Sequence, residues 1–163
     1  MRYTLGLLLG LFIALSSCSN KHDNILITKD FNNEQWSRFD YLHGDFNVSK
    51  APIKYDIVME VTVSEVFPNV YKTYQDESVL AFNLTIVNPE NNGSRSKNYS
   101  FNLKDKDGNW KADNTDGYYH FKLPIMAGMT FTEKGSYTFK IENKYPKDPL
   151  YGIKNLTLKF VNQ

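Results

Sequence analysis

The chain is poor in the residues that build disulfide-rich or metal-centred domains. It holds one cysteine, Cys18, among 163 residues, which excludes a disulfide framework and any all-cysteine metal site. Its three histidines, His22, His43 and His120, are too scattered to suggest a catalytic or zinc cluster. A nucleophile elbow, a His-Glu-x-x-His motif and a phosphate-binding glycine loop are also missing. We therefore expect a protein that is not an enzyme and needs no cofactor.

An excess of one charge is missing as well. Lysine and arginine total 19 and aspartate and glutamate 18, so the formal net charge is +1 and no electrostatic footprint for nucleic acid is visible. Hydrophobic residues nevertheless make up 41% and aromatic residues 15%, which is enough for a packed core. The length fits one domain.

The longest apolar run is Leu5 to Leu15, eleven residues without charge. It is too short for a transmembrane helix, which needs about 20 apolar residues, and has the length of a signal-peptide core. The run ends in Leu15-Ser16-Ser17-Cys18, which resembles the lipobox of bacterial lipoproteins. In that family the cysteine thiol receives diacylglycerol, the peptide is cut before it, and the new amino group is usually acylated. An ordinary secretory signal is disfavoured, because the single cysteine occupies the position that the lipobox requires.

Cleavage before Cys18 predicts a signal peptide at 1–17, a lipidated N-terminus and tether at 18–33, and a folded domain at 34–163. It removes Arg2 and no acid, so 18 basic and 18 acidic side chains remain. The lipid, at about 0.8 kcal/mol per buried methylene, rather than charge would hold the protein at the outer membrane. The segment Ser19–Asp23 has one acid, whereas an acidic signature there accompanies surface export, so the periplasmic face is favoured.

Period-two alternation dominates the rest of the chain. Tyr55 to Val66 and Val79 to Val87 are the clearest strands, and shorter ones are expected near residues 36–48, 98–103, 119–125, 137–141 and 156–160. No helical period is convincing. The pattern predicts an all-β antiparallel sandwich, jelly-roll or immunoglobulin-like, of about seven to eight strands, with a closed barrel as the alternative.

Two local patterns invite a chemical interpretation. Oxygen-bearing side chains between Asp105 and Asp116 suggest calcium, but Gly108 lies at the wrong offset for an EF-hand, and Asp107-Gly108 is explained by a tight turn. His120 lies in an alternating strand and is expected to face solvent. We therefore expect no metal site.

Loop aromatics are the remaining candidates, because an exposed ring can stack on a sugar or contact a protein partner. A possible glycan or partner surface is predicted at Tyr71, Tyr74, Trp110, Tyr145 and Tyr151. The same residues would equally suit a core, since small β-proteins bury many aromatics.

Several segments together resemble one family. They are the lipobox, the early Trp36, Asp105–Trp110, Phe131–Glu142 in the form F-x-x-x-G-x-Y-x-F-x-I-E, and Pro149–Leu158 in the form P-L-x-G-I-x-x-L-x-L. The chain resembles the gliding-motility lipoproteins of the GldH type from Bacteroidetes.

The resemblance implies a β-rich envelope protein, lipid-anchored through Cys18, that supports gliding motility and the associated secretion machinery without enzyme activity. Its expected partners are the membrane and other envelope proteins. A glycan-binding sandwich lipoprotein of a nutrient-capture system is the alternative.

Overall fold

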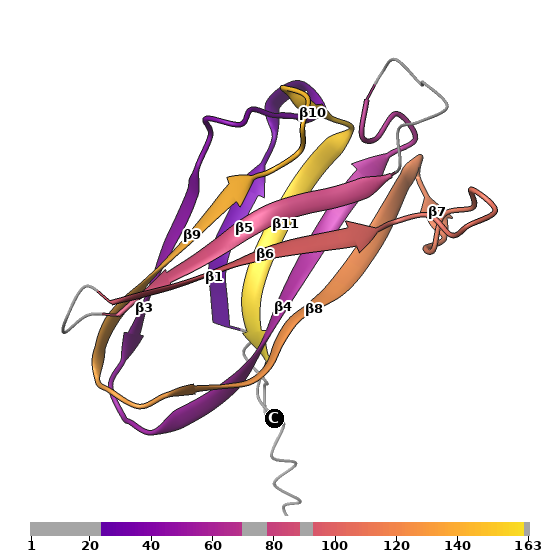
Figure 1. The fold of residues 1–163 in the computed structure, drawn as a ribbon. Coiled ribbons are helices and arrows are strands. Elements are labelled where there is room, and N and C mark those ends of the chain that lie inside the picture. Colours follow the sequence, from indigo (N-terminus) through magenta and orange to yellow (C-terminus); the bar gives the residue numbers. More distant parts are fainter. Residues whose placement is uncertain (1–23, 70–77, 89–92, 162–163) are drawn as a thin grey trace, which may run out of the picture.

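Two antiparallel sheets packed face to face form the protein (Figure 1). The computed structural model describes residues 24–69, 78–88 and 93–161. The large sheet has the order β1-β11-β4-β8-β7, the small sheet β3-β9-β5-β6, and β10 pairs with β2. The strands are β1 Asn24–Asp30, β2 Gln35–Trp36, β3 Leu42–Val48, β4 Ile53–Ser64, β5 Val79–Val87, β6 Ser94–Asn102, β7 Asn114–Thr115, β8 Tyr118–Phe131, β9 Gly135–Asn143, β10 Leu150–Tyr151 and β11 Ile153–Val161.

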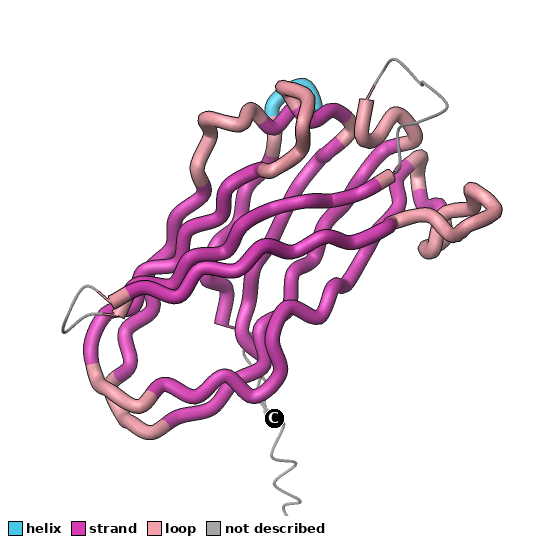
Figure 2. The backbone as a smooth tube through the Cα atoms, viewed as in Figure 1, coloured by secondary structure: helices cyan, strands magenta, loops and turns pink. Residues whose placement is uncertain are grey.

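Strands account for most of the described chain, and its one helical element is the short 3-10 turn η1, Asn32–Glu34 (Figure 2). The predicted all-β antiparallel sandwich is confirmed. Eleven strands are present in the described ranges, more than the seven to eight predicted. The difference lies in β1, which was assigned to the tether, and in β2, β7 and β10, each two residues long and too short to show alternation.

The alternating residues form the core between the sheets, as the sequence predicted. In β4 the side chains of Tyr55, Ile57, Met59, Val61 and Val63 are buried. The two sheets meet through aromatic rings. Phe160 of β11 lies 4.5 Å from the ring of Phe46 and 5.7 Å from that of Phe139, measured between centroids. Such edge-to-face pairs stabilise the interface beyond the area they bury.

Two expectations near the N-terminus need correction. The predicted tether included residues 24–30, but these form β1 and pair with β11 from Asn24 to Asp30, so the sheet begins well before residue 34. The apolar stretch Ile25-Leu26-Ile27 is short, yet it buries Leu26 and Ile27. A first strand or hairpin was expected near residues 36–48, but β2 ends at Trp36, β3 begins at Leu42, and Phe39 lies in the loop between them, 74% exposed.

The two lateral sides of the sandwich differ. On one side β1 and β3 pack closely, because Gly44 lies against the Leu26 carbonyl with no room for a side chain. On the other side lie β6 and β8. β6 pairs only with β5 among the described strands, and β8 pairs beyond β4 only through its first two residues, Tyr118 and Tyr119. This side therefore has strand edges without neighbours in the described part of the chain.

Candidate functional site

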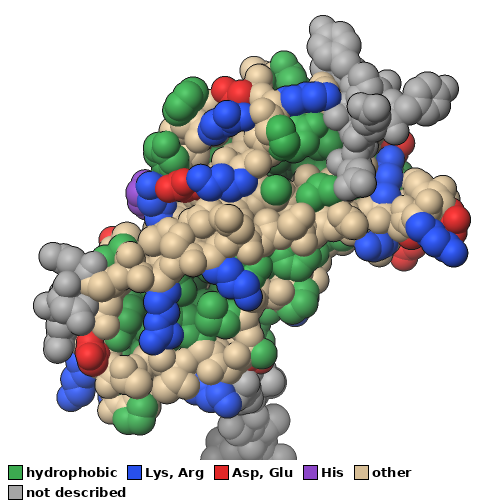
Figure 3. All heavy atoms as spheres, in the orientation of Figure 1, with side chains coloured by type: hydrophobic (Ala, Val, Ile, Leu, Met, Phe, Trp, Pro, Cys, Tyr) green, Lys and Arg blue, Asp and Glu red, His purple; other side chains and the backbone are tan. Residues whose placement is uncertain are grey.

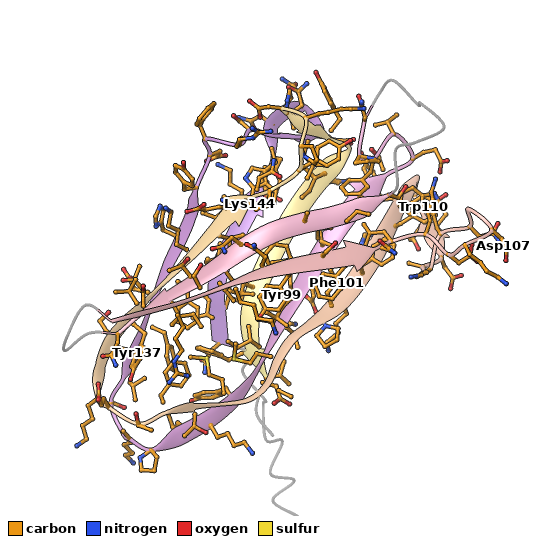
Figure 4. The ribbon with its side chains drawn as sticks, in the orientation of Figure 1. Tyr99, Phe101, Asp107, Trp110, Tyr137 and Lys144 are labelled. Atoms are coloured by element: carbon orange, nitrogen blue, oxygen red, sulfur yellow. The ribbon has the colours of Figure 1, made fainter. Side chains whose placement is uncertain are left out.

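The structure separates the five aromatic residues that the sequence grouped as a possible glycan or partner surface. Tyr71 and Tyr74 lie outside the described residues. Tyr145 is only 6% exposed and belongs to the core, so it offers no open ring. Tyr151 is half-buried in β10, where it pairs with Gln35. Trp110 is half-buried near the end of the sandwich that also carries β7 (Figure 4).

Trp110 is held by neighbours from three segments. Its ring stacks on Tyr119 with centroids 4.3 Å apart, and the Lys104 ammonium lies 4.3 Å from the indole centroid. The indole Nε1 donates to Glu65 Oε2 over 3.0 Å, and the Tyr119 hydroxyl donates to the same oxygen over 2.8 Å. At least one face of the indole is thus covered, which reduces its value as a sugar platform.

A second carboxylate lies at the same end of the sandwich. Glu34 accepts hydrogen bonds of 2.7 Å from the Ser64 and Tyr118 hydroxyls, and the Lys154 ammonium lies 3.7 Å from the Tyr118 ring centroid. The hydrogen bond to Glu34, then its negative charge, raises the pKa of Tyr118. Asn33 and Glu34 both have positive φ, 54° and 53°. Residues other than glycine rarely adopt a positive φ unless the surrounding structure holds the backbone in place. The two hydrogen bonds that the Glu34 carboxylate accepts hold it here.

These two groups, which we name the Glu34–Glu65 cluster, comprise Glu34, Ser64, Glu65, Lys104, Trp110, Tyr118, Tyr119 and Lys154. Each carboxylate accepts two hydrogen bonds, Glu34 from the Ser64 and Tyr118 hydroxyls and Glu65 from the Trp110 indole and the Tyr119 hydroxyl. The described residues contain no group of three or more His, Cys, Asp or Glu side chains placed to hold a metal. The cluster therefore acts chemically as a polar clamp that fixes this end of the sandwich.

The Asp105–Gly108 turn is confirmed by its hydrogen bonds. The Asp105 carboxylate accepts from the N–H groups of Asp107 and Asn109, each over 2.9 Å, and Gly108 supplies the positive φ of 84°. These backbone bonds, that from Asn109 first, lower the pKa of Asp105. A turn thus accounts for the acidic pattern that had suggested calcium.

The outer face of the large sheet carries a polar hollow of about 310 Å³. Thr28 and Thr157 share a hydrogen bond of 3.1 Å there, as do Thr62 and His120. The exposure predicted for His120 is confirmed. The hollow has hydroxyl, amide, carboxylate and ammonium groups in its lining, which includes Thr28, Asp30, Glu60, Thr62, His120, Lys122, Asn155 and Thr157.

Sequence reasoning missed the cations of β6. In the β5–β6 register, Phe101 and Tyr99 lie opposite Leu80 and Phe82, and the same face continues with Lys97 opposite Leu84 and Arg95 opposite Ile86. All four β5 partners are buried, so Arg95 and Lys97 lie on the inner face of β6 by register, although both side chains are exposed. Extending the alternation of Phe101 and Tyr99 back along the strand would have placed Lys97 and Arg95 on the same face. Charged residues are not expected on a face that packs against a core, so the pattern was not extended to them.

The fold defines a class, that of antiparallel β-sandwich domains. A comparison with family models identifies the family within that class. The model described as GldH lipoprotein matches residues 26–159, most of the chain, so the protein belongs to the GldH lipoprotein family. A search of the curated proteins found no match. No helix within the described residues is long and apolar enough to span a membrane.

Proposed function

We propose that this protein is a lipid-anchored envelope component that supports gliding motility and the associated secretion machinery. Membership of the GldH lipoprotein family is the observation that carries the proposal. The lipobox ending at Cys18 supports a lipid anchor, and we place the domain at the periplasmic face of the outer membrane. Its role is non-enzymatic binding of other envelope proteins, since the candidate site consists of carboxylates already engaged by hydroxyl and indole donors.

Gene deletion with complementation tests this function. We expect a deletion strain to lose spreading and secretion, and wild-type protein but not the Cys18→Ala variant to restore both. Comparable levels of the two proteins, measured by immunoblot, control for degradation. Normal spreading, secretion and envelope integrity in the deletion strain would refute the proposal.

A second candidate is glycan binding, favoured by the polar hollow on the large sheet rather than by the predicted loop aromatics. Hydroxyl, amide and carboxylate groups are the partners that sugar hydroxyls need. A glycan array separates the two functions. Binding that is lost in Glu60→Ala and Asn155→Ala would support a nutrient-capture role, and an array without hits would argue against it.

A further inference from the structure

Among the strand edges in the described part of the chain, the free edge of β6, which faces away from β5, is the longest without a bulge or a proline. β6 pairs with β5 over all nine residues without a register shift. On the same side of the sandwich, β8 carries Pro124 and pairs with β4 through two register shifts. Prolines and bulges protect edge strands from adding another strand. On the opposite side, Gly44 of β3 lies against Leu26 of β1. β6 is thus the long, regular edge.

The direction of its backbone groups follows from two hydrogen bonds. Leu103 N–H donates to the Ser78 carbonyl over 2.8 Å, and the Gly93 carbonyl accepts from Asn88 N–H over 2.7 Å. In an antiparallel ladder the bonded residues alternate, so the N–H and C=O groups of the odd-numbered residues of β6 point to β5. Those of the even-numbered residues, Ser94, Ser96, Asn98, Ser100 and Asn102, point to the free edge. Of these, the Asn102 carbonyl accepts from the Lys111 ammonium over 2.9 Å.

The side chains along this edge have a definite order. Phe101 and Tyr99 stack with Phe82 at centroid distances of 6.2 Å and 5.3 Å, and both lie on the inner side of β6 (Figure 4). Figure 3 shows hydrophobic side chains open to solvent on this side, with Lys and Arg side chains beside them. Arg95 lines a cavity of about 210 Å³ together with Ile86, Met129 and Tyr137.

The charged side chains of β6 and β8 are all basic. Arg95 and Lys97 form no ion pair within the described ranges. The Lys97 ammonium lies 4.9 Å from the centroid of the Tyr99 ring. Neither β6 nor β8 contains an acidic residue. A second copy of β6 would add two more cations and no acid to this edge, so net charge disfavours self-pairing. An acidic segment is complementary.

From the free backbone groups and these cations, we infer that β6 binds an extended segment of a partner protein as an added antiparallel strand. The segment has two alternate acidic residues opposite Lys97 and Arg95 and two alternate apolar residues opposite Phe101 and Tyr99. Main-chain hydrogen bonds supply affinity, and the alternate side chains supply specificity. This inference rests on the proposed function, because it names the surface through which the lipoprotein contacts an envelope partner.

A synthetic peptide tests the inference directly. The probe is the blocked peptide T-V-T-V-T-E-T-E-T, whose order matches β6 read from Asn102 back to Ser94, and the control peptide replaces both glutamates with lysine. Binding to the acylated mature protein, residues 18–163, in lipid nanodiscs is measured by fluorescence anisotropy. We expect the acidic peptide to bind at least about tenfold more tightly than the lysine peptide, because its two glutamates pair with Lys97 and Arg95 whereas two lysines would be repelled. Equal affinities, or no binding of either peptide, would overturn the inference.

Variants locate the binding on β6. The double change Arg95→Glu and Lys97→Glu should reverse the preference, and a misfolded protein could not gain affinity for the lysine peptide. The matched control, Lys106→Glu and Lys122→Glu, alters the charge equally elsewhere and should preserve the preference. Ser100→Pro removes an N–H that points to the free edge, and should weaken binding without loss of the domain. If the Lys106→Glu and Lys122→Glu variant changes the affinity as much as the Arg95→Glu and Lys97→Glu variant, the net charge of the protein explains the binding and the inference fails.

Hydrogen exchange and crosslinking complete the test. The peptide should slow exchange at the N–H groups of Ser96, Asn98 and Ser100, whereas Lys97 and Tyr99 should be slow before it is added. A photo-crosslinker at Ser100 in the native envelope should capture a segment with alternating acidic and apolar residues. Capture of a second copy, of a segment without acids, or of nothing would contradict the inference. The deletion phenotype is scored separately, so failure of this surface and failure of the proposed function give different results.

Discussion

Asn143 provides the sharpest test of how the end of β9 is joined to the rest of the fold. Its side chain is 1% exposed. The Nδ2 group donates to the Trp36 carbonyl over 3.0 Å, and Oδ1 accepts from the Tyr145 N–H over 2.8 Å. Asn143→Ala would leave two buried backbone groups without partners. Each costs about 1–3 kcal/mol, so we expect the free energy of unfolding to fall by about 3–4 kcal/mol.

Urea denaturation measures this change, with Trp36 fluorescence as the signal, because its indole is fully buried. A loss of this size corresponds to a fall in melting temperature of about 10 °C for a domain of this length. Asn47→Ala is the matched control, since Asn47 is exposed on β3, and its effect should stay within about 0.5 kcal/mol. A loss below about 1 kcal/mol for Asn143→Ala, or equal losses for both, would refute the argument.

Three further predictions follow from the described contacts. Tyr99→Phe should leave thermal stability unchanged or raise it by up to about 1 kcal/mol, because the buried hydroxyl has no hydrogen-bond partner within the described residues; a clear loss would show that a partner exists. Gly152→Ala should destabilise the domain by about 2–4 kcal/mol in the same urea assay, since φ is +73° and the new Cβ would lie 2.5 Å from the Phe67 nitrogen; a neutral result would contradict this packing. The hydrogen bond to Glu34 is the first cause of the raised pKa of Tyr118, so the folded state holds the phenol proton more tightly than the unfolded state does. The contribution of this group to the stability of the fold is therefore fully present below the unfolded pKa of about 10 and is lost as the pH rises through the folded pKa. Tyr118→Phe should reduce this alkaline loss in melting curves between pH 9 and 11, and an unchanged slope would exclude Tyr118 as its source.

Strands with uninterrupted alternation could be predicted from the sequence, and those with mixed patterns could not. Val79–Val87 was predicted with the bounds of β5, because each buried residue alternates with a less buried one. β1 was assigned to the tether, since three consecutive apolar residues among polar ones give no period. Phe39 was misplaced because an aromatic residue near other aromatics resembles a strand, whereas the chain turns there and Trp36 takes the buried position.

The candidate site was harder to predict than the strands. The hydrogen bonds of Glu34 and Glu65 join residues between 30 and 84 positions apart, and only the sheet order brings them together. The inward positions of Arg95 and Lys97 depend on the register with β5, which local alternation does not determine once charges replace apolar residues. The burial of Tyr145 likewise comes from its tertiary packing, since its neighbours in sequence are those of a loop.

The early start of β1 limits how far the protein can reach. Only five residues lie between Cys18 and Asn24, and six residue steps span at most about 20 Å. If Cys18 carries the proposed lipid, this short segment would keep the domain close to the bilayer, and Glu34, which follows β1, would lie on the side away from the membrane. A protein anchored in the same membrane then searches for the domain in two dimensions, at a raised local concentration. Even a weak interaction along β6 would be populated there, while the same affinity would go unnoticed between freely diffusing molecules.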